Sequence, residues 1–251
     1  MPGRPPRWLL IGNSRWHWAQ ADGGRGAARG GLRFVHRPPP ESAVNPPLAW
    51  AAVGPVPPEA GLDAASRLVL DDVPLPGSPP WLGIDRALAG WWAARRLGGP
   101  VLVADAGTVL SLTRVDGRGR FAGGRLMAGA ALQLRAMGAA TASLPCLEED
   151  LPVGGEDWPL ATAAAMRRGV LGGLAAAVLE AGRLARTQEP GCRIVLTGGD
   201  GARLLPLLRR WTELGEDALV HHPELCLEAL VALRPAPPEE VAQARPRSSR
   251  I

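Results

Sequence analysis

The 251-residue sequence contains neither lysine nor tyrosine. All 28 basic residues are therefore arginine, and the aromatic residues are 9 tryptophans and 2 phenylalanines. The missing lysine excludes Schiff-base chemistry and a Ser-Lys dyad, and the missing tyrosine excludes a tyrosine acid or nucleophile. A Walker A loop is also excluded, because its lysine contacts the phosphates. Any phosphate chemistry must then depend on backbone N–H groups, arginine, carboxylates and a metal ion.

Cysteine is scarce, and long apolar runs are missing. Cys146, Cys192 and Cys226 are odd in number and widely spaced, which fits neither a disulfide framework nor a zinc site. The apolar run at 8–11 is too short for a signal peptide, and the run at 170–179 is too short to span a bilayer. These features predict reduced cysteines in a cytoplasmic protein that has no membrane partner.

An excess of charge of one sign is missing from the folded part of the chain. The net charge is +4, of which residues 1–7 carry +2 and residues 235–251 carry +1. Residues 8–234 therefore have no basic footprint of the kind that nucleic-acid-binding domains carry, and no nucleic-acid partner is expected.

Strand-like and helix-like segments alternate along the chain. Short apolar runs that end at glycine are typical of strands, and apolar residues at spacings of three and four are typical of helices. The predicted strands are 8–11, 15–19, 48–53, 67–70, 101–104, 109–115 and 193–196. The predicted helices are 85–97, 128–140, 162–186, 202–211 and 224–234. This alternation predicts an α/β fold.

A strand, a glycine turn and a second strand occur twice. The two turns are Ile11-Gly12-Asn13-Ser14 and Asp105-Ala106-Gly107-Thr108, with Gly12 and Gly107 95 residues apart. The duplication predicts two related halves, 1–97 and 98–234, with a cleft between them, and the proline-rich 235–251 is predicted to be a disordered tail.

A third turn of this kind is Thr197-Gly198-Gly199-Asp200. Glycine lets backbone N–H groups approach phosphate oxygens, so three such turns favour a nucleotide cleft. Any one of them alone is more often only a turn.

Few residues are candidates for chemistry, and each has a structural alternative. Asp105 ends a strand beside a glycine turn, where it either faces a cation or caps the turn. Asp85 and Arg86 open a helix: they are either a general base beside an arginine that binds a carboxylate, or a helix-start aspartate favoured by the dipole. Thr162 opens another helix and is alternatively an N-cap. The pair His221-His222 is interpreted as a surface loop.

Six segments in this order resemble the type III pantothenate kinases, over residues 8 to about 232. The segments are Ile11-Gly12-Asn13-Ser14-Arg15, Gly83-Ile84-Asp85-Arg86, Asp105-Ala106-Gly107-Thr108, 123–129, 162–169 and 196–200. The resemblance implies two ribonuclease-H-like halves of the actin-like ATPase superfamily. It also implies phosphorylation of pantothenate by ATP at the start of coenzyme A synthesis, by a cytoplasmic homodimer that needs Mg²⁺ and a monovalent cation, K⁺ or NH₄⁺.

The resemblance also implies roles for individual residues. Asp85 matches the proton acceptor, and Gly83, Ile84 and Arg86 complete a pantothenate-binding segment to which Thr162 contributes. Asp105 matches the ligand of the monovalent cation. Contacts with ATP are implied for Thr108 and for the phosphate loop, which consists of Ile11, Gly12, Asn13, Ser14 and Arg15.

The sequence departs from the family pattern at Leu10. The family usually has aspartate there, two residues before the first glycine, and Met127-Ala128-Gly129 also lacks the usual proline before its glycine. With tyrosine missing, Trp81 is the candidate for the aromatic side chain near the substrate. Two alternatives stay open. One is a non-catalytic nucleotide-binding regulator on the same fold, which Leu10 motivates, and the other is another kinase or phosphohydrolase of the superfamily with a different small substrate.

Overall fold

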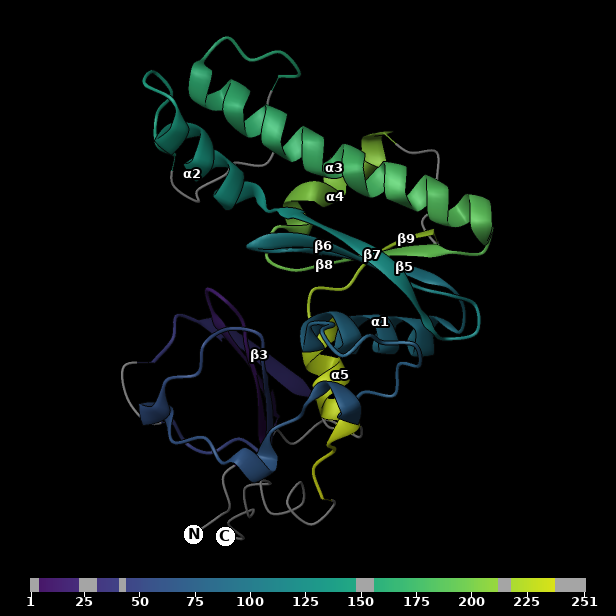
Figure 1. Ribbon diagram of the computed structural model, residues 1–251. Coiled ribbons are helices and arrows are strands. Elements are labelled where there is room, and N and C mark those ends of the chain that lie inside the picture. The colour runs from purple at the N-terminus through teal and green to yellow at the C-terminus, as the bar shows by residue number, and fades with distance from the viewer. Residues whose placement is uncertain (1–4, 23–30, 41–43, 148–155, 212–217, 238–251) are drawn as a thin grey trace, which may run out of the picture. The chain divides into compact units, whose positions relative to one another are not determined.

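The computed structural model describes residues 5–22, 31–40, 44–147, 156–211 and 218–237 (Figure 1). The chain divides into two compact units, each defined by the contacts among its own residues. Unit 1 comprises Met1–Pro74, Pro79–Trp92 and Glu224–Ile251, and unit 2 comprises Leu75–Ser78 and Ala93–Pro223. This division differs from the sequence-based one in two respects: the boundary falls after Trp92, inside a helix, and the last helix belongs to unit 1. Most of the predicted tail lies outside the described residues.

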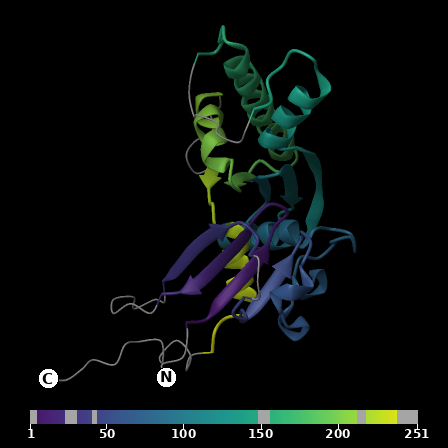
Figure 2. The same cartoon turned by 90° about the vertical axis from the view of Figure 1, so that its left-hand side faces the viewer.

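Unit 1 contains a four-stranded sheet in the order β3-β2-β1-β4 (Figure 2). β1 pairs antiparallel with β2 and parallel with β4, and β2 pairs antiparallel with β3. The strands are β1 (Arg7–Ile11), β2 (Trp16–Ala21), β3 (Leu32–Arg37) and β4 (Ala49–Ala52). The segment 67–70, predicted as a strand, pairs with the sheet only by one bridge from Arg67 to Trp50. It then continues into a 3₁₀ turn, which explains why its apolar run is so short.

Apolar side chains cover both faces of this sheet, because successive residues of a strand point to opposite sides. One face carries a cluster of Leu9, Ile11, Trp16, Trp18 and Trp50, completed by Ala60 of the 3₁₀ turn Pro58–Ala60. Two further 3₁₀ turns follow at Ala64–Ser66 and Leu70–Asp72. Helix α5 (Leu225–Leu233) packs against β1, β2 and β4. The indole N–H of Trp8 donates to the carbonyl of Arg234, 2.7 Å away. These contacts explain why α5 belongs to unit 1.

Unit 2 contains a five-stranded sheet in the order β7-β6-β5-β8-β9. β5 pairs antiparallel with β6 and parallel with β8, which in turn pairs parallel with β9. The strands are β5 (Val101–Ala106), β6 (Val109–Val115), β7 (Phe121–Ala128), β8 (Arg193–Thr197) and β9 (Leu219–His221). Strands β3, β7 and β9 were not predicted. His221 lies in β9, so the interpretation of the histidine pair as a loop is wrong for this residue.

Helices cover one face of the unit 2 sheet (Figure 1). Their apolar side chains meet those of Leu102, Ala104, Leu110, Ile194 and Leu196 in the main core cluster. The helices are α2 (Ala130–Ala140), α3 (Thr162–Gln188) and α4 (Gly201–Trp211), and α1 (Ile84–Leu97) contains the boundary between the units.

Helix α3 has 27 residues, so the apolar run at 170–179 is part of a much longer helix. By length and mean hydropathy (1.2) it is the one described helix that meets the criterion for crossing a membrane. Its buried residues, which include Met166, Val170, Leu174 and Val178, recur at four-residue spacing along one face and belong to the unit 2 core. This is the pattern of a core helix in a globular domain.

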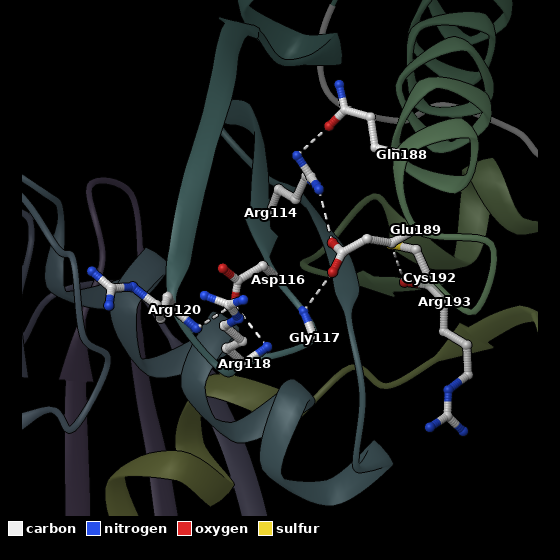
Figure 3. Close-up of polar contacts among 9 residues, drawn as sticks. All are labelled: Arg114, Asp116, Gly117, Arg118, Arg120, Gln188, Glu189, Cys192 and Arg193. Carbon is white, nitrogen blue, oxygen red and sulfur yellow. Dashed lines mark hydrogen bonds and ion pairs between the residues drawn. The ribbon is translucent and has the colours of Figure 1, made fainter.

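The end of α3 is tied to the turn between β6 and β7 (Figure 3). Glu189 accepts hydrogen bonds from the Arg114 guanidinium at 2.8 Å and from the Gly117 N–H at 2.7 Å. Asp116 closes the turn by accepting from the N–H groups of Arg118 and Arg120, each at 2.9 Å. The neighbouring Cys192 is buried, and none of the three cysteines forms a disulfide.

The first four strands of each unit repeat one topology. In both, a central strand pairs antiparallel with the next strand along the chain and parallel with a later one. Leu10 and Asp105 are equivalent, since each lies in the central strand two residues before the turn glycine. The predicted α/β class with two related, ribonuclease-H-like halves is confirmed.

Candidate functional site

The loop after β1 places polar groups at the surface of unit 1. The Gly12 N–H donates to the Arg15 carbonyl at 2.9 Å, which closes a tight turn before β2 begins. Asn13, Ser14 and Arg15 are exposed, whereas Ile11 is buried. The residues of the predicted phosphate loop therefore lie together, with a backbone held by the sheet and side chains directed to solvent.

Gly54, which the sequence analysis did not identify, packs directly against the backbone of this loop. The Val53 N–H donates to the Ile11 carbonyl at 2.9 Å, so the chain leaving β4 runs directly beside the loop. A Cβ atom on Gly54 would overlap with the Gly12 carbonyl and lie 3.2 Å from the Asn13 Cα. The only signal in the sequence is a Gly-Pro pair that follows a strand, which usually marks an ordinary turn.

Asp85 lies in the first turn of α1, directly after Gly83 and Ile84. Its Oδ1 accepts a hydrogen bond from the Arg86 N–H at 2.8 Å. The Cβ of any other residue at 83 would lie 2.6 Å from the same oxygen. The Asp85 carbonyl accepts a hydrogen bond from the Cys226 thiol at 3.6 Å, and this contact connects the turn to α5. The four residues of the predicted pantothenate-binding segment thus form one local structure.

The electrostatic environment of Asp85 suits a proton acceptor. Burial raises the pKa of its carboxyl above the usual value, although the N–H and the charge of Arg86 oppose this effect. Burial also lowers the pKa of Arg86, and the Asp85 charge opposes that shift. Partly desolvated carboxylates of this kind are effective general bases, because their raised pKa is closer to that of the group they deprotonate.

In unit 2, Asp105 is the middle member of a polar row across three strands. In the sheet register it pairs with Ser111 on β6 and with Thr197 on β8. Ser111 and Thr197 are buried, and Asp105 is half-buried. Paired residues of neighbouring strands share a face, so the row gathers two hydroxyls and a carboxylate beside the turn that carries Thr108.

Two glycines allow the backbone to approach this turn closely. Gly198 has a φ of +85°, and a Cβ there would overlap with Asp105 Oδ1 and the Ala106 carbonyl. Gly129 meets the turn on another side, where its N–H donates to the Thr108 carbonyl at 3.0 Å. The surroundings of Asp105 are therefore rich in oxygen atoms, which are the ligands that hard cations such as Mg²⁺ or K⁺ prefer.

Among the described residues, no three His, Cys, Asp or Glu side chains form a cluster that could hold a metal ion. A Mg²⁺ ion that is bound together with a nucleotide needs no such cluster, because it is usually held by one or two carboxylates and the phosphates.

Thr162 is the first residue of α3 and follows the N-cap, Ala161, so its alternative interpretation as an N-cap is wrong. Its side chain is exposed. Near it, the first turns of α3 and the preceding segment form an open cleft of about 430 Å³. The cleft is lined by Asp157, Trp158, Arg168, Gly169, Gly172 and Gly173. None of them was assigned a role from the sequence, although Arg168 and Gly169 lie in the segment 162–169.

The remaining candidates are distributed between the units. The loop 11–15 and the segment 83–86 belong to unit 1, whereas Asp105, Thr108 and Thr162 belong to unit 2. Trp81 is 83 % exposed, so its indole is accessible just before Gly83. Leu10 is buried, and it offers no polar group at the position equivalent to Asp105.

Known proteins share both the fold and the sequence pattern. The structure superposes on a Baf family protein from Campylobacter jejuni with a TM-score of 0.55 and 15% identity, over 90% of this chain and 96% of the other. Residues 76–183 match the family profile described as type III pantothenate kinase.

Proteins named type III pantothenate kinase resemble the chain over most of its length. The protein from Thermosynechococcus vestitus is 39% identical over 238 residues, covering 88% of this chain and 89% of the relative. The one from Gloeobacter violaceus is 38% identical, covering 81% and 89%. With its fold, its glycine turns and the Asp85 segment in place, the chain belongs to the type III pantothenate kinase family.

Proposed function

We propose that this protein transfers the terminal phosphate of ATP to the primary hydroxyl of pantothenate, giving 4'-phosphopantothenate and ADP in the first step of coenzyme A biosynthesis. The observation that carries the proposal is the Asp85 carboxylate, which burial makes more basic, in a segment with Arg86 and within a chain of this family. The reaction needs a proton acceptor, and because this chain contains neither lysine nor tyrosine, the partly buried Asp85 carboxylate is assigned that role.

In the proposed mechanism, Asp85 accepts the proton of the pantothenate hydroxyl. As that proton leaves, the hydroxyl oxygen forms a bond to the γ-phosphorus, and the bond from phosphorus to the bridging oxygen of ADP breaks. The electron pair of the broken bond stays on ADP. Arg86 has the charge and the planar donor geometry to bind the pantothenate carboxylate, and Thr162 offers a hydroxyl for a second contact.

Nucleotide binding is assigned to the glycine turns of the two units. In unit 1, Gly12 and Asn13 offer backbone N–H groups, while Ser14 and Arg15 offer exposed side-chain donors. Thr108 is assigned a contact with ATP in unit 2. Mg²⁺ bound with ATP would neutralise charge on the phosphates. Asp105, in its oxygen-rich turn, is the proposed ligand of a monovalent cation, K⁺ or NH₄⁺.

A homodimer in the cytoplasm completes the proposal. Unit 2 exposes large apolar side chains that a partner copy would cover, at Leu126, Leu132, Trp158 and Leu160. Sedimentation at micromolar concentration is expected to give twice the mass of 26.3 kDa. A sedimenting monomer would contradict this part of the proposal and leave the reaction intact.

The reaction is tested by ADP formation with ATP, Mg²⁺, potassium and pantothenate. Asp85→Asn should reduce kcat by at least about a hundredfold, because a positioned base contributes 10²–10⁴-fold. Asp71→Asn is the matched control, since Asp71 is an exposed aspartate outside the segment. In the wild type, kcat should fall as the pH is lowered through the raised pKa of Asp85, because protonation removes the base.

Two outcomes would overturn parts of the proposal. An unchanged rate in Asp85→Asn would remove Asp85 as the base. If ATP raises the Tm of the wild-type protein while no ADP forms with pantothenate, the chain is a nucleotide-binding regulator instead.

A further inference from the structure

A histidine ring lies against the glycine loop of unit 1. His17 is on β2, and its side chain shares a face of the sheet with Leu10, its register partner on β1. A Cβ atom built on Gly12 would lie 3.2 Å from His17 Nε2 and 3.6 Å from its Cδ2. The Nε2 edge of the imidazole therefore flanks the backbone of the phosphate loop.

The other edge of the same ring starts a chain of polar contacts within unit 1. His17 Nδ1 lies 2.8 Å from Nδ1 of His36, its register partner on β3. His36 Nε2 in turn lies 3.2 Å from Oε1 of Glu224, the residue before α5. A carboxylate and two imidazoles thus form a line that ends at the loop.

The two sheets carry different side chains in the equivalent rows beside their glycine turns. Across the unit 2 sheet, the row beside the glycine turn contains Asp105 with its hydroxyl neighbours. The equivalent row in unit 1 contains His36, His17, Leu10 and Ala51. Because Leu10 is apolar, His17 is the polar side chain of that row nearest to the Gly12 loop.

The line of contacts has two proton arrangements. With both rings neutral, His17 donates from Nδ1 to His36, His36 donates from Nε2 to Glu224, and His17 Nε2 has a bare lone pair. When one more proton is added, His36 donates from both nitrogens, and His17 Nε2 becomes an N–H donor beside the loop. The negative Glu224 carboxylate favours this second arrangement, because its charge acts to raise the pKa of His17.

We propose that His17 donates a hydrogen bond from Nε2 to a phosphate oxygen of ATP, with His36 and Glu224 as positioning residues that orient the ring and stabilise the added proton. The inference rests on the proposed function to the extent that ATP occupies the loop 11–15. It assigns to His17 the phosphate contact on this side of the loop, where Leu10 cannot provide a polar group.

The charges around His17 explain why the proton is taken up with the nucleotide. In the protein without ATP, burial, His36 and Arg15 lower the pKa of His17 to about 4, and Glu224 opposes them. The groups that face it from β1 and β4, Leu10 and Ala51, are uncharged. A phosphate anion beside Nε2 favours the protonated arrangement, so ATP binding near pH 7 should take up as much as one proton.

The test is titration calorimetry of the full-length protein with MgATP in buffers of different ionisation enthalpy, without pantothenate. Asparagine places its amide where Nδ1 lies and glutamine places it where Nε2 lies. His17→Asn should therefore keep the contact with His36 but weaken ATP binding about tenfold or more, the range expected for a lost hydrogen bond to a charged group. His17→Gln should remain within about threefold of the wild type. Both variants should lose the proton uptake.

A purely structural histidine gives the opposite order, since it needs its contact with His36. Binding weakened as much in His17→Gln as in His17→Asn, or unchanged in both, would overturn the inference. Glu224→Gln leaves His17 in place and covers the case in which a His17 variant does not fold. Proton uptake should fall in this variant, and wild-type uptake would overturn the role of Glu224.

Failure of this inference is distinguishable from failure of the proposed function. If pantothenate is phosphorylated but ATP binding does not depend on His17, only the inference fails. If ATP binding depends on His17 but pantothenate is not phosphorylated, only the proposed function fails. A wild-type protein that does not bind ATP would overturn both.

Discussion

Gly54 offers the most direct test of how the phosphate loop is held. Gly54→Ala adds one methyl group where the chain leaving β4 runs against the loop. The new Cβ would overlap with the Gly12 carbonyl and be 3.2 Å from the Asn13 Cα, and both partners are backbone atoms that cannot rotate away. The φ of Gly54 is not positive, so the substitution tests the close approach alone and adds no backbone strain.

The size of the effect follows from the overlap. Carbon and oxygen atoms without a hydrogen bond pack at about 3.5 Å, so the two backbones must separate by roughly 1 Å. Overpacking of this kind costs about 1–3 kcal/mol in free energy of unfolding. For a chain of this length that corresponds to a fall in Tm of about 2–12 °C. A shift of about 1 Å in the loop should also raise the KM for ATP about tenfold or more.

The measurements are thermal unfolding and the KM for each substrate. Gly191→Ala is the matched control, because a Cβ there has no described atom within 4 Å and its φ is not positive. The control should keep both the wild-type Tm and the wild-type KM for ATP. In Gly54→Ala the KM for pantothenate should change much less than the KM for ATP.

Two results would refute this reasoning. If the Tm and the KM for ATP equal those of the control, the loop moves to make room for the methyl group without loss of stability or of ATP binding. A lower Tm with an unchanged KM for ATP would show that Gly54 supports the fold but not nucleotide binding.

Three other side chains have effects that single substitutions test. Asp105→Asn should abolish the stimulation of ADP formation by potassium, and stimulation as in the wild type would exclude this cation ligand. Glu189→Gln weakens the contacts with Arg114 and the Gly117 N–H; urea titration should show a loss of about 1–2 kcal/mol at unchanged KM, and an unchanged midpoint would contradict the role of this tie. The pKa of His17 is lowered from 6.5 to about 4 in the folded protein, so the stability it contributes is complete above pH 6.5 and decreases as the pH falls toward 4. His17→Asn should remove this part of the pH dependence. The free energy of unfolding is measured by urea titration at several pH values, and an equal decrease between pH 6.5 and 4 in both proteins would exclude this contribution of His17.

Much of the fold could be predicted from the sequence because its signals are local. A short apolar run ending at Gly12 or Gly107 predicts a hairpin, and both hairpins are present. The strands that escaped prediction lack such signals. β7 contains two adjacent glycines and no buried residue, and β9 has three residues. Their place in the sheet depends on pairing with distant strands, which no local pattern reveals.

The candidate site shows the same limit. The segment around Asp85 and the loop 11–15 could be identified because their residues are consecutive. Gly54 could not, because its importance comes from contact with a loop about forty residues earlier. The line from His17 to Glu224 joins residues more than two hundred positions apart, and His17 by itself reads only as one polar residue in an alternating strand.

The division of the chain has a consequence for synthesis on the ribosome. Unit 2 ends at Pro223, so all of its residues have been translated before α5 begins. Unit 1 starts first but lacks α5 until residue 233 is made, and until then the surface of β1, β2 and β4 that α5 covers stays open. Domains of nascent chains usually fold in the order of their translation. Here unit 2 is complete before unit 1, and the segment that completes unit 1 brings Glu224 to the two histidines.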